Sequence, residues 1–161
     1  MHGTDGVCPV STGHGTAQSS GGQCGDVAEN HSMRILLVDD SPVNLRVLSI
    51  MLERFGWCAP DTALSGREAL DKHRAQPFDI ILMDCFMPDM DGFAAAGEIR
   101  RHERDAAHTI IIALTANAAS GDRELCLSAG MDDYLAKPIQ VDRMQQMLEK
   151  WRQRIVAGTA C

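Results

Sequence analysis

The sequence predicts an α/β fold with a doubly wound parallel sheet, built from five strand–helix units. From Met33 onward, short apolar runs alternate with longer amphipathic segments. Three of the runs, ILLV, IILM and IIIAL, are apolar throughout, which is typical of strands buried on both faces under covering helices. Parallel strands need crossover connections, and the intervening segments are long enough to supply right-handed helical ones.

We expect five strands, each a short apolar or β-branched run with polar residues at its ends. They are Arg34–Val38, Trp57–Ala63, Asp79–Met83, Ile110–Leu114 and Asp133–Ala136.

The first helix has clear signals at both ends. Ser41 and Pro42 supply a capping hydroxyl and a first-turn proline, and Gly56 stands where a C-terminal cap is needed. Five apolar residues predict the face that packs on the sheet: Val43, Val47, Met51, Leu52 and Phe55.

Later helices carry comparable signals. Ser65 and Glu68 have the spacing of a capping box, and Gly130 closes the fourth helix. The fifth helix has an apolar stripe made of Val141, Met144, Leu148, Trp151 and Ile155. We expect these side chains to pack in the core.

Residues 1–32 differ from the rest of the chain. They hold seven of the 14 glycines and seven Ser or Thr, with no Lys or Arg. Such a segment buries too little apolar area to offset the entropy of ordering it. We therefore expect a flexible tail or interdomain linker over 1–32, one folded domain over 33–155 and a short C-terminal tail over 156–161.

Composition excludes several classes of function. The formal charge of −7 argues against a nucleic-acid-binding surface. No apolar run approaches the roughly 20 residues that cross a bilayer, so we expect no membrane contact by this segment and a cytoplasmic location. The six cysteines form no CxxC pair, which favours free thiols over a zinc site or a disulfide framework.

Polar residues follow four of the predicted strands. Asp39 and Asp40 follow the first, Asp84 the third, Thr115 the fourth and Lys137 the fifth. In a flavodoxin-like (βα)5 sheet of order 2-1-3-4-5, the carboxyl ends of all strands meet at one edge, where such folds bind ligands. Strands one and three are neighbours in that order, so the three aspartates should lie together.

Three neighbouring carboxylates repel one another unless some are protonated or a cation neutralises them. Mg²⁺ suits such a site, because it is a hard ion that binds carboxylates and accepts phosphate oxygens. A carboxylate nucleophile, a metal, a lysine and a hydroxyl are the parts that phosphoryl transfer to an aspartate needs. Taken one at a time, these residues also fit plainer roles such as helix caps or solvated charges.

A second acidic pair, Asp132 and Asp133, precedes its strand and therefore lies at the opposite edge, so we assign it no metal role. The three histidines near helices are expected on the surface: His73, His102 and His108.

Four blocks of the sequence closely resemble the response regulator receiver family. They are ILLVDDSPVN, IILMDCFMPDMDG, IIALTANA and GMDDYLAKPI, in the order and spacing of that family and within about Met33 to Arg154. The second and fourth blocks look most like receivers of hybrid sensor histidine kinases.

The resemblance implies a role for each residue of the site. Asp84 would accept the phosphoryl group, and Asp40 with Asp84 would ligate Mg²⁺ (or Mn²⁺) directly. Asp39 would act through water, and the backbone carbonyl of Phe86 would complete the ligands. Thr115 would bind a phosphoryl oxygen and Lys137 would pair with Asp84.

Two further residues take part in the same resemblance. Tyr134 would be the switch aromatic that couples the site to the face formed by the fourth helix, fifth strand and fifth helix. The bond before Pro138 would be cis, as only about 5–6% of X–Pro bonds are.

The partner implied is a histidine phosphotransfer domain or the phosphohistidine of a kinase. The domain would catalyse its own phosphorylation and dephosphorylation, without a kinase ATP site or an output domain in this chain. A parent hybrid kinase, membrane-bound or not, is one context, and a stand-alone receiver acting as a binding module is another. An aspartate-nucleophile phosphatase would need Asp-x-Asp after the first strand, where this chain has Asp39-Asp40-Ser41.

Overall fold

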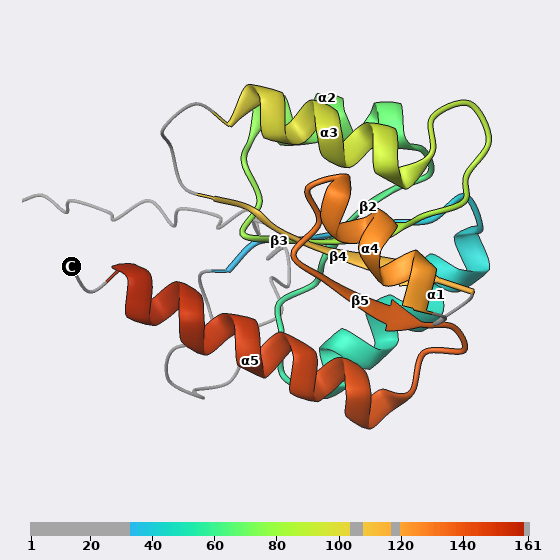
Figure 1. The fold of residues 1–161 in the computed structure, drawn as a ribbon. Coiled ribbons are helices and arrows are strands. Elements are labelled where there is room, and N and C mark those ends of the chain that lie inside the picture. Colours follow the sequence, from blue (N-terminus) through green and yellow to red (C-terminus); the bar gives the residue numbers. More distant parts are fainter. Residues whose placement is uncertain (1–32, 104–107, 117–119, 160–161) are drawn as a thin grey trace, which may run out of the picture.

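A computed structural model describes residues 33–103, 108–116 and 120–159 (Figure 1). Within these ranges the chain alternates strictly between strands and helices. The elements are β1 (Ile35–Val38), α1 (Pro42–Arg54), β2 (Asp61–Ala63), α2 (Gly66–Ala75), β3 (Ile80–Asp84), α3 (Gly92–His102), β4 (Ile110–Thr115), α4 (Ser120–Ser128), β5 (Asp133–Ala136) and α5 (Val141–Thr159).

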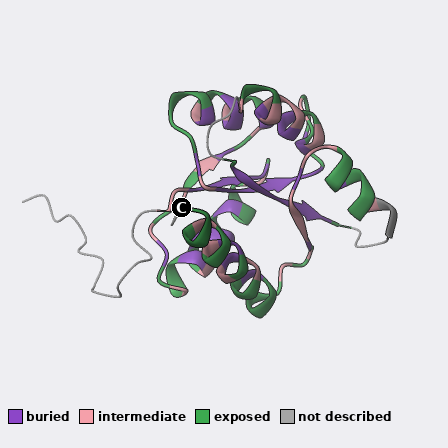
Figure 2. Cartoon of the chain, turned by 60° about the vertical axis from the view of Figure 1, so that its left-hand side comes forward, coloured by how far each residue is buried: buried purple, intermediate pink, exposed green. Residues whose placement is uncertain are grey.

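The five strands form one parallel sheet in the order β2-β1-β3-β4-β5, which confirms the predicted fold class and strand order. Helices α1 and α5 cover one face, where their buried residues pack with Leu37, Leu82 and Leu114. Helices α2, α3 and α4 cover the other face around Ile81 and Ile111. Figure 2 shows the resulting layers, with buried strands between helices that are exposed on their outer sides.

Strand β2 is shorter than expected, because it covers Asp61–Ala63 and not Trp57–Ala63. Trp57 belongs to the turn that ends α1, where its N–H donates to the Leu52 carbonyl at 3.1 Å. Pro60 follows and has no N–H to donate to a neighbouring strand. The residues before Asp61 therefore do not join the sheet, and of them only Trp57 is buried in the core.

The predicted packing face of α1 is wrong for two of its five residues, because Val43 and Val47 are 71% and 46% exposed. Leu52 is buried, and Met51 and Phe55 pack against the core, as predicted. Leu45 and Leu48, which were not predicted, are also buried against the sheet. The helix is apolar on several sides, so periodicity alone did not select the buried side. One consequence is an exposed aliphatic strip on α1, made of Val43, Val47 and Ile50.

The helix ends match their signals. The Ser41 hydroxyl caps α1 and the Ser65 hydroxyl caps α2, by accepting from Asn44 N–H and Glu68 N–H. Gly56 and Gly130 take positive φ values of 79° and 92° just beyond α1 and α4, where residues with a Cβ are strained.

Three other expectations differ from the structure. His73 is buried, not on the surface: it lies on the packed side of α2 and its Nδ1 accepts from the Phe78 N–H at 3.4 Å. The stripe of α5 packs as expected except for Val141, which is exposed. Helix α5 also runs to Thr159, into the segment where we expected a C-terminal tail, and residues 160–161 lie outside the described part.

The expected tail or linker over residues 1–32 also lies outside the described residues. Among the helices that the structure describes, none combines the length and the apolar character needed to span a bilayer. Of the cysteines within the described ranges, Cys85 and Cys126 are buried free thiols.

Candidate functional site

The carboxyl ends of four strands bring the predicted residues to one edge of the sheet. Asp84 and Thr115 are the last residues of β3 and β4, while Asp39 directly follows β1 and Lys137 directly follows β5. The parallel registers place Asp84 beside Leu114 and Thr115 beside Ala136. Residues from distant parts of the chain therefore converge as the alternation of strands and helices predicts.

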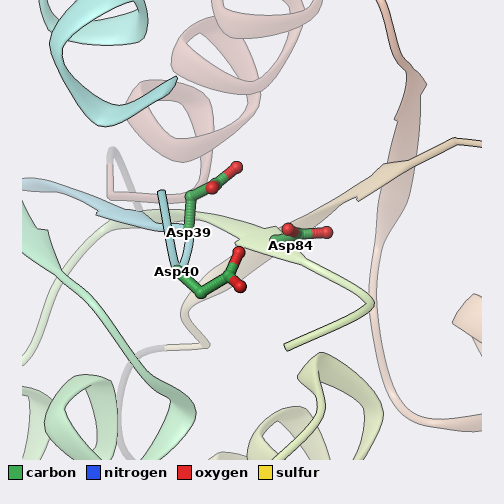
Figure 3. A group of neighbouring side chains, drawn as sticks. All are labelled: Asp39, Asp40 and Asp84. Atoms are coloured by element: carbon green, nitrogen blue, oxygen red, sulfur yellow. The ribbon is translucent and has the colours of Figure 1, made fainter. Parts of the chain in front are cut away.

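Three carboxylates approach one another at this edge. One oxygen each from Asp39, Asp40 and Asp84 lies within 4.8 Å of the others (Figure 3). Asp39 and Asp84 are 0% and 5% exposed, whereas Asp40 is open to solvent. Two buried acids and one exposed acid so close together repel strongly without a cation.

The Asp39 carboxylate accepts hydrogen bonds from several donors. Its Oδ1 accepts from the Ser41 N–H at 2.9 Å and from the Asn44 side-chain amide at 3.0 Å. Its Oδ2 accepts from the Lys137 ammonium at 3.0 Å. Asn44, in the first turn of α1, was not identified from the sequence, although its place five residues after Asp39 in a helix start is compatible with that contact.

Lys137 bridges the two buried acids. Its Nζ lies 3.0 Å from Asp39 Oδ2 and 3.0 Å from Asp84 Oδ2. Burial by itself lowers the pKa of Lys137, but its hydrogen bonds and charge attraction to Asp84 and Asp39 outweigh burial and raise the pKa above its ordinary value. Lys137 is therefore a fixed positive charge beside Asp84.

The loop after β3 is shaped around Asp84. The Asp84 Oδ1 accepts from the Phe86 N–H at 3.2 Å. A Cβ at Gly92 would lie 2.3 Å from the Asp84 carbonyl oxygen, so only glycine lets α3 begin this close to the strand end. The Phe86 side chain is exposed and packs edge-to-face on Phe93 at 6.2 Å.

Asp40 differs from its neighbours in lacking protein partners. Within the described part of the chain, its carboxylate makes neither a hydrogen bond nor an ion pair. A solvent-facing carboxylate beside two buried ones offers hard oxygen donors of the kind that Mg²⁺ prefers. The donor set therefore fits a magnesium ion.

Thr115 is buried and faces helix α4. Its hydroxyl donates to Asp122 Oδ2 at 3.2 Å. The sequence did not single out Asp122, because an acid in the first turn of a helix is an ordinary feature. Tyr134, the expected switch residue, is partly buried against the core on the same side of the sheet.

The remaining predicted feature is the bond before Pro138, which is cis. The acidic pair at the other edge takes part in none of these contacts. Asp132 binds Arg100 and Asp133 binds Lys150.

Comparisons with known proteins agree on a family. Residues 35–149 match the response regulator receiver domain. The chain is 41% identical over 123 residues to the signal transduction histidine-protein kinase BarA of Shigella flexneri, which covers 75% of this chain and 13% of that protein. It spans only 4 to 14% of the curated kinases and hybrid signalling proteins that it matches.

Two solved structures extend the likeness. The receiver domain of sensor histidine kinase PA1611 from Pseudomonas aeruginosa PAO1, solved with a magnesium ion in its active site cleft, is 45% identical with a TM-score of 0.68 and covers 75% of this chain and 98% of that one. The co-crystal structure of the Saccharomyces cerevisiae histidine phosphotransfer protein Ypd1 with the Ssk1 receiver domain gives 28% identity and a TM-score of 0.70, over 74% of this chain and 88% of that one.

Proposed function

The chain belongs to the response regulator receiver domain family, and on this basis we propose that Asp84 accepts a phosphoryl group from a phosphohistidine. The observation that carries the proposal is the setting of Asp84. Its buried carboxylate lies 3.0 Å from the Lys137 ammonium and among two further carboxylates. A nucleophile, a neutralising cation and a surplus of negative charge thus meet at one point.

We propose magnesium as the cofactor of this donor set, and Mn²⁺ accepts the same oxygen ligands. Asp40 and Asp84 would hold it directly, with the Phe86 carbonyl as a third protein ligand and Asp39 acting through water. When bound, the ion would neutralise the carboxylates and the oxygens of the incoming phosphoryl group. The receiver of PA1611, which was solved with magnesium in its cleft, supports this choice.

The transfer step follows from the remaining groups. One oxygen of the Asp84 carboxylate forms the bond to phosphorus while the bond from phosphorus to the donor imidazole nitrogen breaks. The imidazole keeps the electron pair and takes a proton from solvent. Lys137, which is already bound to Asp84, stays close enough to pair with the phosphoryl oxygens. The Thr115 hydroxyl would donate to another of these oxygens.

We propose a histidine phosphotransfer domain or a kinase phosphohistidine as the donor. A groove of about 300 Å³ adjoins the site, and Asp39 and Lys137 line it together with Val47, Met51 and Ile139. The exposed strip of α1 continues this apolar surface. A donor that brings an imidazole to Asp84 must cover this rim, and the complex of Ypd1 with the Ssk1 receiver supports a histidine phosphotransfer protein in that role.

Phosphorylation would switch the face formed by α4, β5 and α5. Thr115 contacts α4, and Tyr134 lies on β5, so a movement of the Thr115 hydroxyl toward the phosphoryl group changes contacts at both elements. We propose that the domain belongs to a hybrid sensor kinase, since the relatives it matches include hybrid kinases more than ten times its length.

Mass spectrometry of the intact protein tests the acceptor. Wild type incubated with Mg²⁺ and a small phosphodonor such as acetyl phosphate should gain the mass of one phosphoryl group, and Asp84→Asn should gain none. Asp132→Asn is the matched control, because it makes the same chemical change at the opposite edge and should label like wild type. Labelling of Asp84→Asn at the same stoichiometry would rule out Asp84.

A further inference from the structure

Asp122 is a carboxylate that the phosphoryl-transfer scheme leaves without a role. It lies in the first turn of α4, half-buried, and its Oδ2 accepts the hydrogen bond of the Thr115 hydroxyl at 3.2 Å. We propose that Asp122 is a positioning residue that holds this hydroxyl on α4 in the unphosphorylated protein and so opposes phosphoryl capture. This inference rests on the proposed function of Asp84 and Thr115.

The strand geometry explains why the hydroxyl faces α4 at rest. Side chains alternate along β4, so Thr115 points to the same side as Ile111 and Ala113, which pack with α2, α3 and α4. Leu82, two residues before Asp84 on β3, packs on the side of α1 and α5. The Thr115 hydroxyl and the Asp84 carboxylate thus start from opposite faces of the sheet and meet only at its edge.

Competition follows from the chemistry of a hydroxyl. A threonine has one O–H to donate, so a full hydrogen bond to a phosphoryl oxygen requires giving up the one to Asp122. The bond to Asp122 has an ionised acceptor, which makes it stronger than one between neutral groups. Each phosphorylation event therefore works against this contact, and removing the contact should favour the phosphorylated form.

The position of Asp122 links this competition to α4. The carboxylate is part of the helix, so its bond to Thr115 ties the start of α4 to the end of β4. When Thr115 turns to the phosphoryl group, that tie is lost. Asp122 thus sets how much of the phosphoryl-binding free energy is needed to release the first turn of α4.

Beryllofluoride, which mimics a phosphoryl group on aspartate, provides the test. Calorimetric titration with Mg²⁺ and beryllofluoride should show Asp122→Ala binding about three- to tenfold tighter than wild type, which matches the net contribution of one ordinary intramolecular hydrogen bond. The partial exposure of Asp122 to solvent keeps the effect below that of a buried bond to a charged group. Asp122→Asn keeps an amide oxygen acceptor and should lie between the two. Glu124→Ala, which removes the same charge from an exposed position of α4, should bind like wild type.

A double mutant separates positioning from simple charge repulsion. In a Thr115→Ala background, Asp122→Ala should leave the affinity for beryllofluoride unchanged, because the hydroxyl through which Asp122 acts is gone. The same gain in that background would overturn the proposal and assign the effect to charge alone.

A second measurement needs no magnesium or beryllofluoride. Three-bond NMR couplings of the Thr115 side chain should report a χ1 population in Asp122→Ala that differs from that of wild type. An unchanged χ1 population in Asp122→Ala would overturn the proposal. If wild type bound no beryllofluoride, the proposed function of Asp84 would fail with it; if wild type bound and Asp122→Ala bound no tighter, only the role of Asp122 would fail.

Discussion

Acidic side chains gather at both edges of the sheet: the amino edge, formed by the amino ends of the strands, and the carboxyl edge, formed by their carboxyl ends. Only at the amino edge is the negative charge balanced by basic side chains. At the amino edge, Arg100 lies 2.6 Å from Glu103 and 2.6 Å from Asp132, and it also donates to the carbonyls of Thr109 and Gly130. At the carboxyl edge, Lys137 faces Asp39 and Asp84, while Asp40 has no partner among the described residues.

The two acids of the amino edge are satisfied from several sides. Asp132 Oδ2 also accepts from the Ile111 N–H at 2.8 Å, and Glu103 Oε1 accepts from the Thr109 N–H at 2.8 Å. His108 lies 2.6 Å from Asp132 Oδ1. These contacts tie the end of α3 to the starts of β4 and β5, so this edge contributes to stability.

The comparison shows that the number of acids does not identify a binding site. At the amino edge, Arg100, His108 and Lys150 all lie beside carboxylates. At the carboxyl edge, Lys137 is the one basic side chain paired with the cluster among the described residues, and it contacts Asp39 and Asp84 but not Asp40. A surplus of negative charge is costly for the isolated fold and becomes favourable when a cation or a phosphoryl group with its metal arrives. We therefore expect the carboxyl edge, with its surplus of negative charge, to bind the cation.

The largest expected effect tests the balanced edge. Asp132→Ala should lower the free energy of unfolding by about 3 kcal/mol, because it leaves the largely buried Arg100 without one of its partners. Urea denaturation without divalent ions measures this. Asp40→Ala is the matched change at the other edge, where loss of a repelled charge should leave stability unchanged or slightly higher. Comparable losses of unfolding free energy in Asp132→Ala and Asp40→Ala would contradict the proposed difference between the two edges.

Magnesium should act on one edge alone. At a concentration ten times its dissociation constant, Mg²⁺ should raise the free energy of unfolding of wild type by about 1.4 kcal/mol. Asp40→Asn should lose this increment. Asp132→Asn, although less stable to begin with, should keep it in full, and a magnesium effect that disappeared in Asp132→Asn would place the ion at the wrong edge.

The smallest expected effect concerns the pH dependence of the free energy of unfolding, to which each edge contributes in a different pH range. Burial raises the pKa of Glu103, but hydrogen bonds from Thr109 and Arg100 outweigh it and leave the pKa below its ordinary value. The unfolded state then binds more protons, so this contribution is present above the ordinary pKa of glutamate and is lost as the pH falls through the folded pKa. Glu103→Gln should flatten this acid limb of the stability curve.

The pKa of Lys137 is shifted in the opposite direction, so its contribution to stability has the opposite pH dependence. Its raised pKa means that its contribution is complete below the ordinary pKa of lysine and is lost as the pH rises through the folded pKa. Lys137→Met should therefore flatten the alkaline limb. Urea midpoints measured across the pH range separate the limbs, and a change of the alkaline limb in Glu103→Gln would show that the edges are coupled.

Much of this molecule follows from short stretches of sequence. The runs ILLV, IILM and IIIAL marked β1, β3 and β4, because strands buried on both faces need apolar residues throughout. Ser41, Gly56 and Gly130 marked helix ends through capping and positive φ, which are local properties. The polar residues after these strands were located by the same local reasoning.

Other features were not readable in this way. Helix α1 is apolar on several sides, and only contact with the sheet selected Leu45 and Leu48 over Val43 and Val47. His73 was expected on the surface, although its spacing from Ala69 and Leu70 matches the buried side of α2. The helical spacing of His73 indicated burial, but the surface prediction followed from the polar type of the residue.

The sequence by itself determined the fold class, the order of elements and the polar residues gathered at the carboxyl ends of the strands, because hydrophobic period and turn chemistry act over a few neighbouring residues. Only the tertiary structure showed the contacts of Lys137 with Asp39 and of Thr115 with Asp122. Lys137 reaches Asp39 across 98 positions of sequence, and Thr115 faces Asp122 because of the side of the sheet that α4 covers. Such pairings depend on strand register and helix placement, which are set by the packing of the whole domain.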